Sequence, residues 1–328
     1  MFVTADEEPQ NVFDINYTEV SESEIASTLR ELGVKRPLGM DSTQDFRLSI
    51  AGAQEKTAFL KMKKKWCKPF GSTPTTHIFK TPIGAMGSDF RFDDSIDNEW
   101  SCLKILLKFG IEVCHAHIES FEDQRALVIE RFDRKWEQIN GKEFIYRIPQ
   151  EDMCQAMGLS PFQKYQSEGG VGIKEIAQYF RTSVDYQDLE TFFKTIMLFD
   201  LLYATDGHAK NFSVFLKRAG VKLTPIYDVT SVYSLIQRKQ LVEQKVSMAM
   251  KVGNSGDYKL KRIQLRHYQE TAKLCGLSDD VFDKIYEDIK YGYRKLVFDD
   301  NEIPSEINQE SLSSILEGME KRAKVIFS

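Results

Sequence analysis

The helix expected at residues 191–203 constrains the fold of this chain more than any other feature. Its sequence, TFFKTIMLFDLLY, is apolar on almost every side, which is typical of a helix buried on all its faces. The composition then changes to the polar loop ATDGHAKN at 204–211. Two short apolar runs at 212–216 and 223–228, with Gly220 between them, predict a β-hairpin. The sequence thus predicts a polar loop held between a buried helix and a hairpin.

Three polar residues of this segment have a spacing that suits phosphoryl transfer. Asp206 precedes Asn211 by five residues, and Asp228 ends the predicted hairpin. This is the order of parts in the catalytic lobe of a protein kinase. Asp206 would receive or orient the hydroxyl proton of the acceptor, while Asn211 and Asp228 would offer the oxygen ligands that Mg²⁺ prefers. Lys210 could screen the charge that builds on the transferred phosphate.

Each of these residues also has an ordinary structural explanation. Asp-Gly is a common turn, and a single Asp after a strand is commonly a cap. His208 suggests a metal site, but no second His or Cys lies at the spacing of a zinc ligand. The kinase interpretation therefore depends on the ordered set and not on any one residue.

The upstream sequence offers candidates for the other half of a nucleotide site. Residues 45–50 and 56–60 read as two strands joined by a turn of small residues, whose backbone N–H groups could face phosphates. The turn holds a single Gly, so it is no G-x-G-x-x-G loop. A further strand at 75–80 ends in Lys80, where kinases keep the lysine that holds the phosphates. A lysine at a strand end is also commonly a solvated edge charge.

A helix and another strand are expected next. The helix lies between residues 95 and 110 and carries Glu99, which could orient Lys80 or be a plain surface charge. The strand at 126–129 is fully apolar. The backbone of the three residues after it could face an adenine: Glu130, Arg131 and Phe132. Phe132 could equally belong to the core.

Taken together, these segments resemble the HipA family of bacterial serine/threonine toxin kinases. The matching blocks lie at 47–58, 73–80, 95–99, 130–134, 149–155, 204–213 and 223–228. The resemblance implies an α+β, two-lobed protein-kinase-like fold with a small β-rich N-lobe and a larger helical C-lobe. The chain would divide into an acidic N-terminal segment at 1–36, an N-lobe with the phosphate loop at 37–132, and a C-lobe with the catalytic and metal-binding residues at 133–328.

The resemblance also implies roles for individual residues. Asp206 would be the catalytic base, His208, Lys210 and Asn211 would contact phosphate and magnesium, and Tyr227 would pack on the adenine side. Asn211 and Asp228 would hold the metal. The phosphate loop would consist of Ala51, Gly52, Ala53, Gln54, Glu55 and Lys56. Lys80 would bind phosphate, and residues 130–132 would form the nucleotide hinge.

Ser49 would be the autophosphorylation site of such a kinase. A phosphate dianion on Ser49 would compete with the phosphates of ATP for the same N–H donors, so the modification would switch the kinase off. Relatives with a second serine two positions on differ from this chain, which has Ala51 there.

The resemblance implies ATP and Mg²⁺ as cofactors and a toxin that phosphorylates a serine of an aminoacyl-tRNA synthetase, tryptophanyl or glutamyl, to halt translation. The chain has only residues 1–36 where longer relatives carry an additional N-terminal subdomain, so it resembles the short HipT type of three-gene systems. Its partners would then be a HipB-like DNA-binding antitoxin and a small HipS-like protein. Two alternatives stay open: a catalytically silent ATP-binding partner in an antitoxin–DNA complex, and a small-molecule kinase.

Charge and cysteine content bear on the partners and the cellular location of the chain. The net charge of -5 argues against general affinity for nucleic acid, so DNA association would come through the antitoxin. The basic runs at 61–65 and 259–262 read as solvated faces. Five cysteines without a C-x-x-C pair, and no signal-peptide or membrane-spanning pattern, predict a cytoplasmic protein.

The glycine-rich stretch at 165–172 could border a protein-substrate cleft or be a surface loop. Amphipathic helices are expected at 266–274, 279–296 and 310–325.

Overall fold

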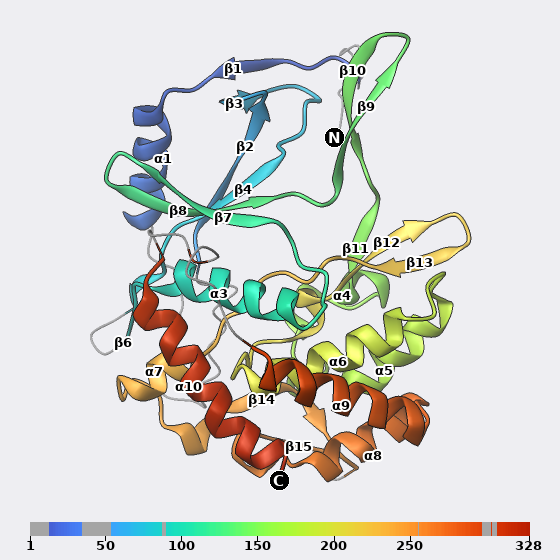
Figure 1. The fold of residues 1–328 in the computed structure, drawn as a ribbon. Helices are drawn as coiled ribbons and strands as arrows, with labels where there is room; N and C mark the ends of the chain where they lie inside the picture. The colour runs from blue at the N-terminus through green and yellow to red at the C-terminus, as the bar shows by residue number, and fades with distance from the viewer. Residues whose placement is uncertain (1–12, 35–53, 87–89, 255, 297–302, 304–306) are drawn as a thin grey trace. The chain divides into compact units, whose positions relative to one another are not determined.

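The structure is a computed structural model that describes residues 13–34, 54–86, 90–254, 256–296, 303 and 307–328. The chain divides into two structural units (Figure 1). Unit 1 comprises residues 1–36, 55–81 and 115–149, and unit 2 comprises residues 37–54, 82–114 and 150–328. Among the described residues, strands dominate unit 1 and helices dominate unit 2.

An antiparallel six-stranded sheet forms the frame of unit 1, with the order β1-β3-β2-β4-β8-β7. Its strands are β1 (Tyr17–Glu19), β2 (Lys56–Met62), β3 (Lys65–Pro69), β4 (His77–Lys80), β7 (Ala116–Phe121) and β8 (Gln124–Glu130). Helix α1 (Glu22–Val34) packs against β7 and β8. A separate hairpin consists of β9 (Arg134–Ile139) and β10 (Lys142–Arg147). The strands predicted around 56–60, 75–80 and 126–129 are confirmed as β2, β4 and β8.

Aromatic side chains fill the core of unit 1. The buried cluster joins Ile25 and Leu29 of α1 to Phe59, Trp66, Phe79 and Phe121 of the sheet. The Phe79 ring lies edge-on to Phe59 and Trp66, with ring centroids 4.9 and 4.8 Å apart, a geometry that aromatic pairs prefer. Because Phe79 belongs to β4, this packing fixes the strand that ends at Lys80.

Unit 2 is built from helices and short sheets. Its helices are α3 (Ser95–Lys108), α4 (Met153–Ala156), α5 (Ile173–Tyr179), α6 (Asp188–Leu201), α7 (Tyr233–Gln237), α8 (Leu265–Cys275), α9 (Asp279–Arg294) and α10 (Gln309–Ile326). Its strands are β5 (Gly84–Met86), β6 (Phe90–Phe92), β11 (Gln150–Asp152), β12 (Ser213–Lys217), β13 (Gly220–Leu223), β14 (Ser247–Val252) and β15 (Asp257–Lys259). The three C-terminal amphipathic helices predicted from the sequence are confirmed as α8, α9 and α10.

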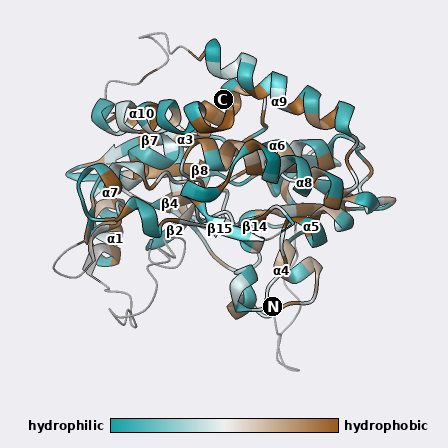
Figure 2. Cartoon of the chain, turned by 90° about the horizontal axis from the view of Figure 1, so that it is seen from below, coloured by the Kyte–Doolittle hydropathy of each residue, from teal (hydrophilic) through white to brown (hydrophobic). Residues whose placement is uncertain are grey.

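Helix α6 is buried on nearly every face, as its apolar sequence predicts. Every residue from Thr195 to Leu201 is buried, and Figure 2 colours much of the helix as hydrophobic. The helix begins at Asp188, earlier than predicted, where the Asp188 carboxylate accepts hydrogen bonds from the Ser183 hydroxyl and, at 2.7 Å, from the Leu223 N–H. It ends before Tyr203, whose φ of 55° is left-handed and incompatible with a continuing helix.

The predicted hairpin is present, but its second strand lies earlier than expected. Strands β12 and β13 pair antiparallel, with Gly220 opposite Lys217 as the first residue of β13. Strand β13 ends at Leu223, so it shares only that residue with the run predicted at 223–228. Pro225 explains the early end, because proline has no N–H to donate to a strand partner. Beyond it, Ile226 forms an isolated parallel bridge with Val113. Asp228 therefore follows an irregular segment and not a strand.

Among the described residues, no helix is both long enough and apolar enough to cross a membrane. All five cysteines are buried free thiols.

Candidate functional site

The loop at 204–211 is held closely against helix α6. A Cβ atom on Gly207 would lie 2.5 Å from the Phe199 ring of α6, so the loop reaches this position only with glycine there. The N–H of His208 donates to the Asp206 carbonyl at 2.8 Å, and the N–H of Asn211 donates to the His208 carbonyl at 2.9 Å. The Asp-Gly pair is thus part of a packed turn that aims the side chains around it.

Tyr165 holds the carboxylate of Asp206. Its hydroxyl donates a hydrogen bond to Asp206 Oδ1 at 2.5 Å, and the tyrosine itself is only 5% exposed. The glycine-rich pattern at 165–172 does not assign a role to Tyr165. No spacing pattern could have found it, because the two residues are 41 positions apart in the chain.

Lys210 pairs with Asp152, a second residue to which the sequence assigns no role. Its Nζ lies 2.6 Å from Asp152 Oδ2. Asp152 also caps helix α4, where its Oδ1 accepts from the Gln155 N–H at 3.0 Å. The D-x-x-Q pattern at 152–155 would have indicated the cap, but nothing in it indicates Lys210. The pairing fixes the position of the lysine ammonium beside the loop.

The structure brings together the two residues predicted to hold metal. Asn211 Nδ2 donates to the backbone carbonyl of Asp228 at 3.2 Å. Asn211 is 1% exposed, and within the described part of the chain its Oδ1 has no hydrogen-bond partner. A buried amide oxygen without a donor is costly, and a cation would relieve that cost. Asp228 adopts a left-handed φ of 59°, a strained conformation for a residue with a side chain.

This oxygen set fits Mg²⁺ better than zinc. Amide and carboxylate oxygens are hard ligands of the kind that Mg²⁺ accepts, usually together with water and phosphate oxygens. The described residues contain no group of three or more His, Cys, Asp or Glu placed to hold a metal ion. The chemistry of Asn211 and Asp228 thus fits the predicted Mg²⁺ site, which stays a prediction.

Tyr227 supports the loop through its hydroxyl group. The hydroxyl donates to the Lys210 carbonyl at 2.8 Å and lies 2.6 Å from Ser213 Oγ. Burial raises the pKa of Tyr227 above its ordinary value, so the group keeps its proton for this bond. The predicted packing of Tyr227 on an adenine is a separate matter and stays a prediction.

His208 is neutral near pH 7. The residue is 2% exposed, and burial, aided by the positive charge of Lys164, lowers the pKa of its imidazole to about 4. Within the described part of the chain, neither ring nitrogen has a hydrogen-bond partner. Its predicted contact with phosphate or magnesium would thus use a neutral ring nitrogen and not a positive charge.

The predicted nucleotide contacts of unit 1 are only partly described. Lys80 ends β4, is 6% exposed, and pairs in register with Lys56 and Leu127. Gln54 and Glu55 are partly buried and Lys56 is exposed at the start of β2. Four residues of these predictions lie outside the described residues: Ser49, Ala51, Gly52 and Ala53.

The segment predicted to be the nucleotide hinge already uses two of its backbone donors. The N–H groups of Glu130 and Arg131 donate to the carbonyls of His115 and Thr76, at 2.8 and 2.9 Å. The Arg131 guanidinium forms an ion pair with Asp133, at 2.8 Å. A contact between this segment and adenine would therefore involve other groups, and the hinge role of residues 130–132, Phe132 included, stays a prediction.

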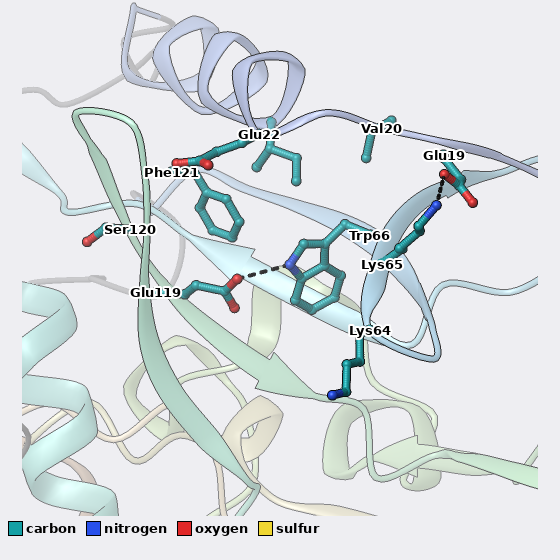
Figure 3. Close-up of a pocket in the computed structure, with 10 residues that line it drawn as sticks. Glu19, Val20, Glu22, Lys64, Lys65, Trp66, Glu119, Ser120 and Phe121 are labelled. Atoms are coloured by element: carbon teal, nitrogen blue, oxygen red, sulfur yellow. Dashed lines mark hydrogen bonds and ion pairs between the residues drawn. The ribbon is translucent and has the colours of Figure 1, made fainter.

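A pocket of about 360 Å³ lies entirely within unit 1. It is lined by Glu19, Val20, Glu22, Ile25, Lys64, Lys65, Trp66, Glu119, Ser120 and Phe121 (Figure 3). Two pairs of its lining residues contact each other: Trp66 Nε1 donates to Glu119 at 3.1 Å, and Lys65 lies 2.6 Å from Glu19. None of the residues predicted for catalysis or nucleotide binding lines this pocket, so it is not part of the candidate site.

Comparison with known families and proteins gives consistent matches. The family model described as HipA-like C-terminal domain matches residues 48–296. Y4mE of Sinorhizobium fredii, named as a candidate kinase, is 32% identical over 221 residues, which cover 66% of this chain and 49% of Y4mE. The serine/threonine-protein kinase toxin HipA of Shewanella oneidensis is 29% identical over 216 residues, which cover 62% of this chain and 47% of that protein. The chain thus spans about half the length of these curated relatives.

A solved structure shares the fold. The complex of Shewanella oneidensis HipA with HipB and its operator DNA matches with a TM-score of 0.72 at 20% sequence identity, covering 99% of this chain and 76% of the matched chain. At this identity the likeness concerns the fold alone. It agrees with the mixed helix-and-sheet, kinase-like class that the sequence predicts.

Proposed function

Because the chain belongs to the HipA-like C-terminal domain family, we propose that it is a serine/threonine protein kinase that uses ATP and Mg²⁺. The observation that carries the proposal is the arrangement of Asp206, Asn211 and Asp228. The Asp206 carboxylate is held by the Tyr165 hydroxyl. The Asn211 side chain donates to the Asp228 carbonyl, and its buried Oδ1 has no donor among the described residues. The two curated relatives are both named as kinases, one of them as a candidate.

The proposed reaction needs positioning and charge neutralisation more than covalent chemistry. The hydroxyl oxygen of the acceptor bonds to the γ-phosphorus, the bond from that phosphorus to the bridging oxygen breaks, and ADP leaves with the electron pair. Asp206 takes the hydroxyl proton. Asn211 and Asp228 would hold Mg²⁺, which neutralises phosphate oxygens when bound. Lys210, kept in place by Asp152, adds a positive charge beside the loop.

The rest of the predicted nucleotide site belongs to the same proposal. Lys80 would bind phosphate, residues 51–56 would form the phosphate loop, and residues 130–132 would face adenine. The lobes proposed for this kinase are residues 37–132 and 133–328. Support for these assignments is the match of the family model, which includes residues 48–296.

We further propose that the kinase is a toxin, as its Shewanella relative is named. An antitoxin partner is supported by the matched complex of HipA, HipB and DNA. The synthetase substrate, autophosphorylation at Ser49, a HipS-like partner and a cytoplasmic location rest on the resemblance described above and stay predictions.

A phosphotransfer assay would test the proposed activity. The purified chain is incubated with Mg²⁺ and ATP labelled on the γ-phosphate in an extract of bacterial cytosol, beside Asp206→Asn. We expect label on serine or threonine of a protein, and a loss of roughly 10²- to 10⁴-fold in the variant, the usual contribution of a general base. Asp279→Asn, at a side chain that is 75% exposed, is the matched control and should keep the wild-type rate.

The outcome separates the competing functions. If the wild-type chain binds ATP and labels no protein, the protein-kinase proposal is wrong. Label recovered on a small molecule would favour a small-molecule kinase, and binding without any transfer would favour a silent ATP-binding partner.

A further inference from the structure

Tyr165 lies against the proposed catalytic carboxylate and has no assigned role. We infer that Tyr165 is a positioning residue, which holds Asp206 in the orientation that receives the proton of the acceptor. The inference rests on the proposed kinase function. It deepens that proposal by naming the residue that orients the base.

The contact between the two side chains is direct and buried. The Tyr165 hydroxyl donates to Asp206 Oδ1 at 2.5 Å, and the tyrosine is 5% exposed. Its ring also lies edge-on to the His208 imidazole, with ring centroids 5.0 Å apart. A carboxylate with one oxygen held by a fixed donor rotates less about its Cβ–Cγ bond. Its other oxygen therefore keeps one direction relative to the loop.

The backbone around Tyr165 is itself fixed to the catalytic loop. The N–H of Ala209, inside that loop, donates to the Lys164 carbonyl at 3.2 Å. The Tyr165 carbonyl accepts from the N–H groups of Glu168 and Gly170 at 2.9 and 3.0 Å, which closes the tyrosine's segment into a tight turn. Tyr165 is thus supported from both neighbouring peptide groups, so its hydroxyl is aimed by the fold.

Two further features show that this turn is tightly packed and anchored. A Cβ on Gly170 would lie 2.1 Å from the Gln163 carbonyl oxygen, so the turn closes this tightly only with glycine. Gln166 Oε1 accepts from the Lys251 N–H of strand β14 at 2.7 Å. The segment at 163–170 is therefore tied to a strand on one side and to the catalytic loop on the other. The glycine-rich stretch noted in the sequence has a support role that its composition did not reveal.

Tyr165→Phe tests the inference because it removes the hydroxyl and keeps the buried ring. We expect kcat for phosphoryl transfer to fall roughly 10- to 100-fold, the scale of losing a well-oriented catalytic group. The KM for ATP should stay the same, because the bond acts on the base and not on the nucleotide. Tyr186→Phe makes the same chemical change at a tyrosine that is 96% exposed, and should leave both constants at the wild-type values.

A double variant separates positioning from a structural role. In the Asp206→Asn background the carboxylate is gone, so Tyr165→Phe should cause no further loss of residual transfer. A structural role would lower kcat by the same factor in both backgrounds, and that result would overturn the inference. An unchanged kcat in Tyr165→Phe would overturn it as well. If the wild-type chain itself transfers no phosphate, the proposed function fails and the inference fails with it. If the wild type is active and Tyr165→Phe is unaffected, only the inference is rejected.

Discussion

Burial decides the protonation state of two histidines in this chain. His77 on strand β4 and His208 in the loop at 204–211 each have a pKa lowered to about 4, and burial is the largest cause in both. Lys61 lowers the pKa of His77 further by charge repulsion, as Lys164 does for His208. Both side chains are therefore neutral near pH 7. An ordinary imidazole, with a pKa of about 6.5, would be partly protonated at that pH.

His77 should make the stability of the fold depend on pH. Its folded-state pKa of about 4 lies below the ordinary value of 6.5, so the unfolded chain binds a proton in that range that the folded chain does not. Neutral His77 therefore makes its full contribution to the free energy of unfolding above about pH 6.5, and this contribution is lost as the pH falls toward 4. We expect His77→Gln to flatten the fall in unfolding free energy across this window, by up to about 1.4 kcal/mol per pH unit.

Urea unfolding of wild type and His77→Gln at several pH values between 6.5 and 4.5 would measure this slope. His115→Gln, at an exposed histidine of the same unit, is the matched control and should keep the wild-type slope. Identical slopes for wild type and His77→Gln would show that His77 does not titrate as its burial implies.

At the scale of elements, one buried carboxylate joins three helices of unit 2. Asp200 of α6 is fully buried and accepts from Arg322 of α10 and Tyr268 of α8. The Tyr268 hydroxyl lies 2.6 Å from Asp200 Oδ2, and Arg322 Nη2 lies 2.8 Å from the same oxygen. Arg322 also donates to the Ile263 carbonyl at 2.7 Å. Because α6 leads into the loop at 204–211, this group fixes the helix that precedes Asp206.

Arg322→Met should therefore destabilise the protein strongly. The change leaves the Asp200 carboxylate buried without its cation, which typically costs about 3–5 kcal/mol. Lys324→Met is the matched control on the same helix, because Lys324 pairs with Glu320 while both side chains are mostly exposed. A solvent-exposed pair of this kind contributes little to stability. Chemical denaturation of the two variants measures the loss of unfolding free energy in each. Equal losses would show that the buried pair stabilises the fold no more than the exposed one.

At the scale of the whole molecule, the charges argue against direct binding to DNA. The chain has a net charge of -5. Its basic runs are also partly neutralised in place, since Lys65 lies 2.6 Å from Glu19 and Arg262 lies 3.9 Å from Asp257. Affinity for DNA that is independent of sequence requires several cations free to replace the counterions of phosphates.

We expect the chain alone to leave a fluorescently labelled DNA duplex unbound at micromolar protein and physiological salt. Adding the proposed DNA-binding antitoxin should raise the fluorescence anisotropy of a duplex that carries its operator. Binding by the chain alone, with an affinity that falls steeply as salt rises, would contradict this expectation and assign a DNA-binding surface to this chain.

Features that depend on local pattern could be read from the sequence. The apolar run that becomes α6, the amphipathic repeats of α8, α9 and α10, and the apolar run that becomes β8 follow from the pattern of neighbouring residues. The ordered set of Asp206, Asn211 and Asp228 was recognisable for the same reason, because the residues lie close together in the chain. The short β13 was the local exception, since the effect of Pro225 outweighed the apolar pattern.

The partners of these residues were decided only by the tertiary structure. Tyr165 reaches Asp206 across 41 positions, Asp152 reaches Lys210 across 58, and Arg322 reaches Asp200 across 122. No periodicity encodes such pairs, because which side chain completes a hydrogen bond depends on how distant helices and turns pack. The sequence alone thus determined which groups could do the chemistry. The packing of the folded chain determined that Tyr165 holds Asp206 and that Asp152 pairs with Lys210. It also buried the Asn211 Oδ1 where no described residue donates to it.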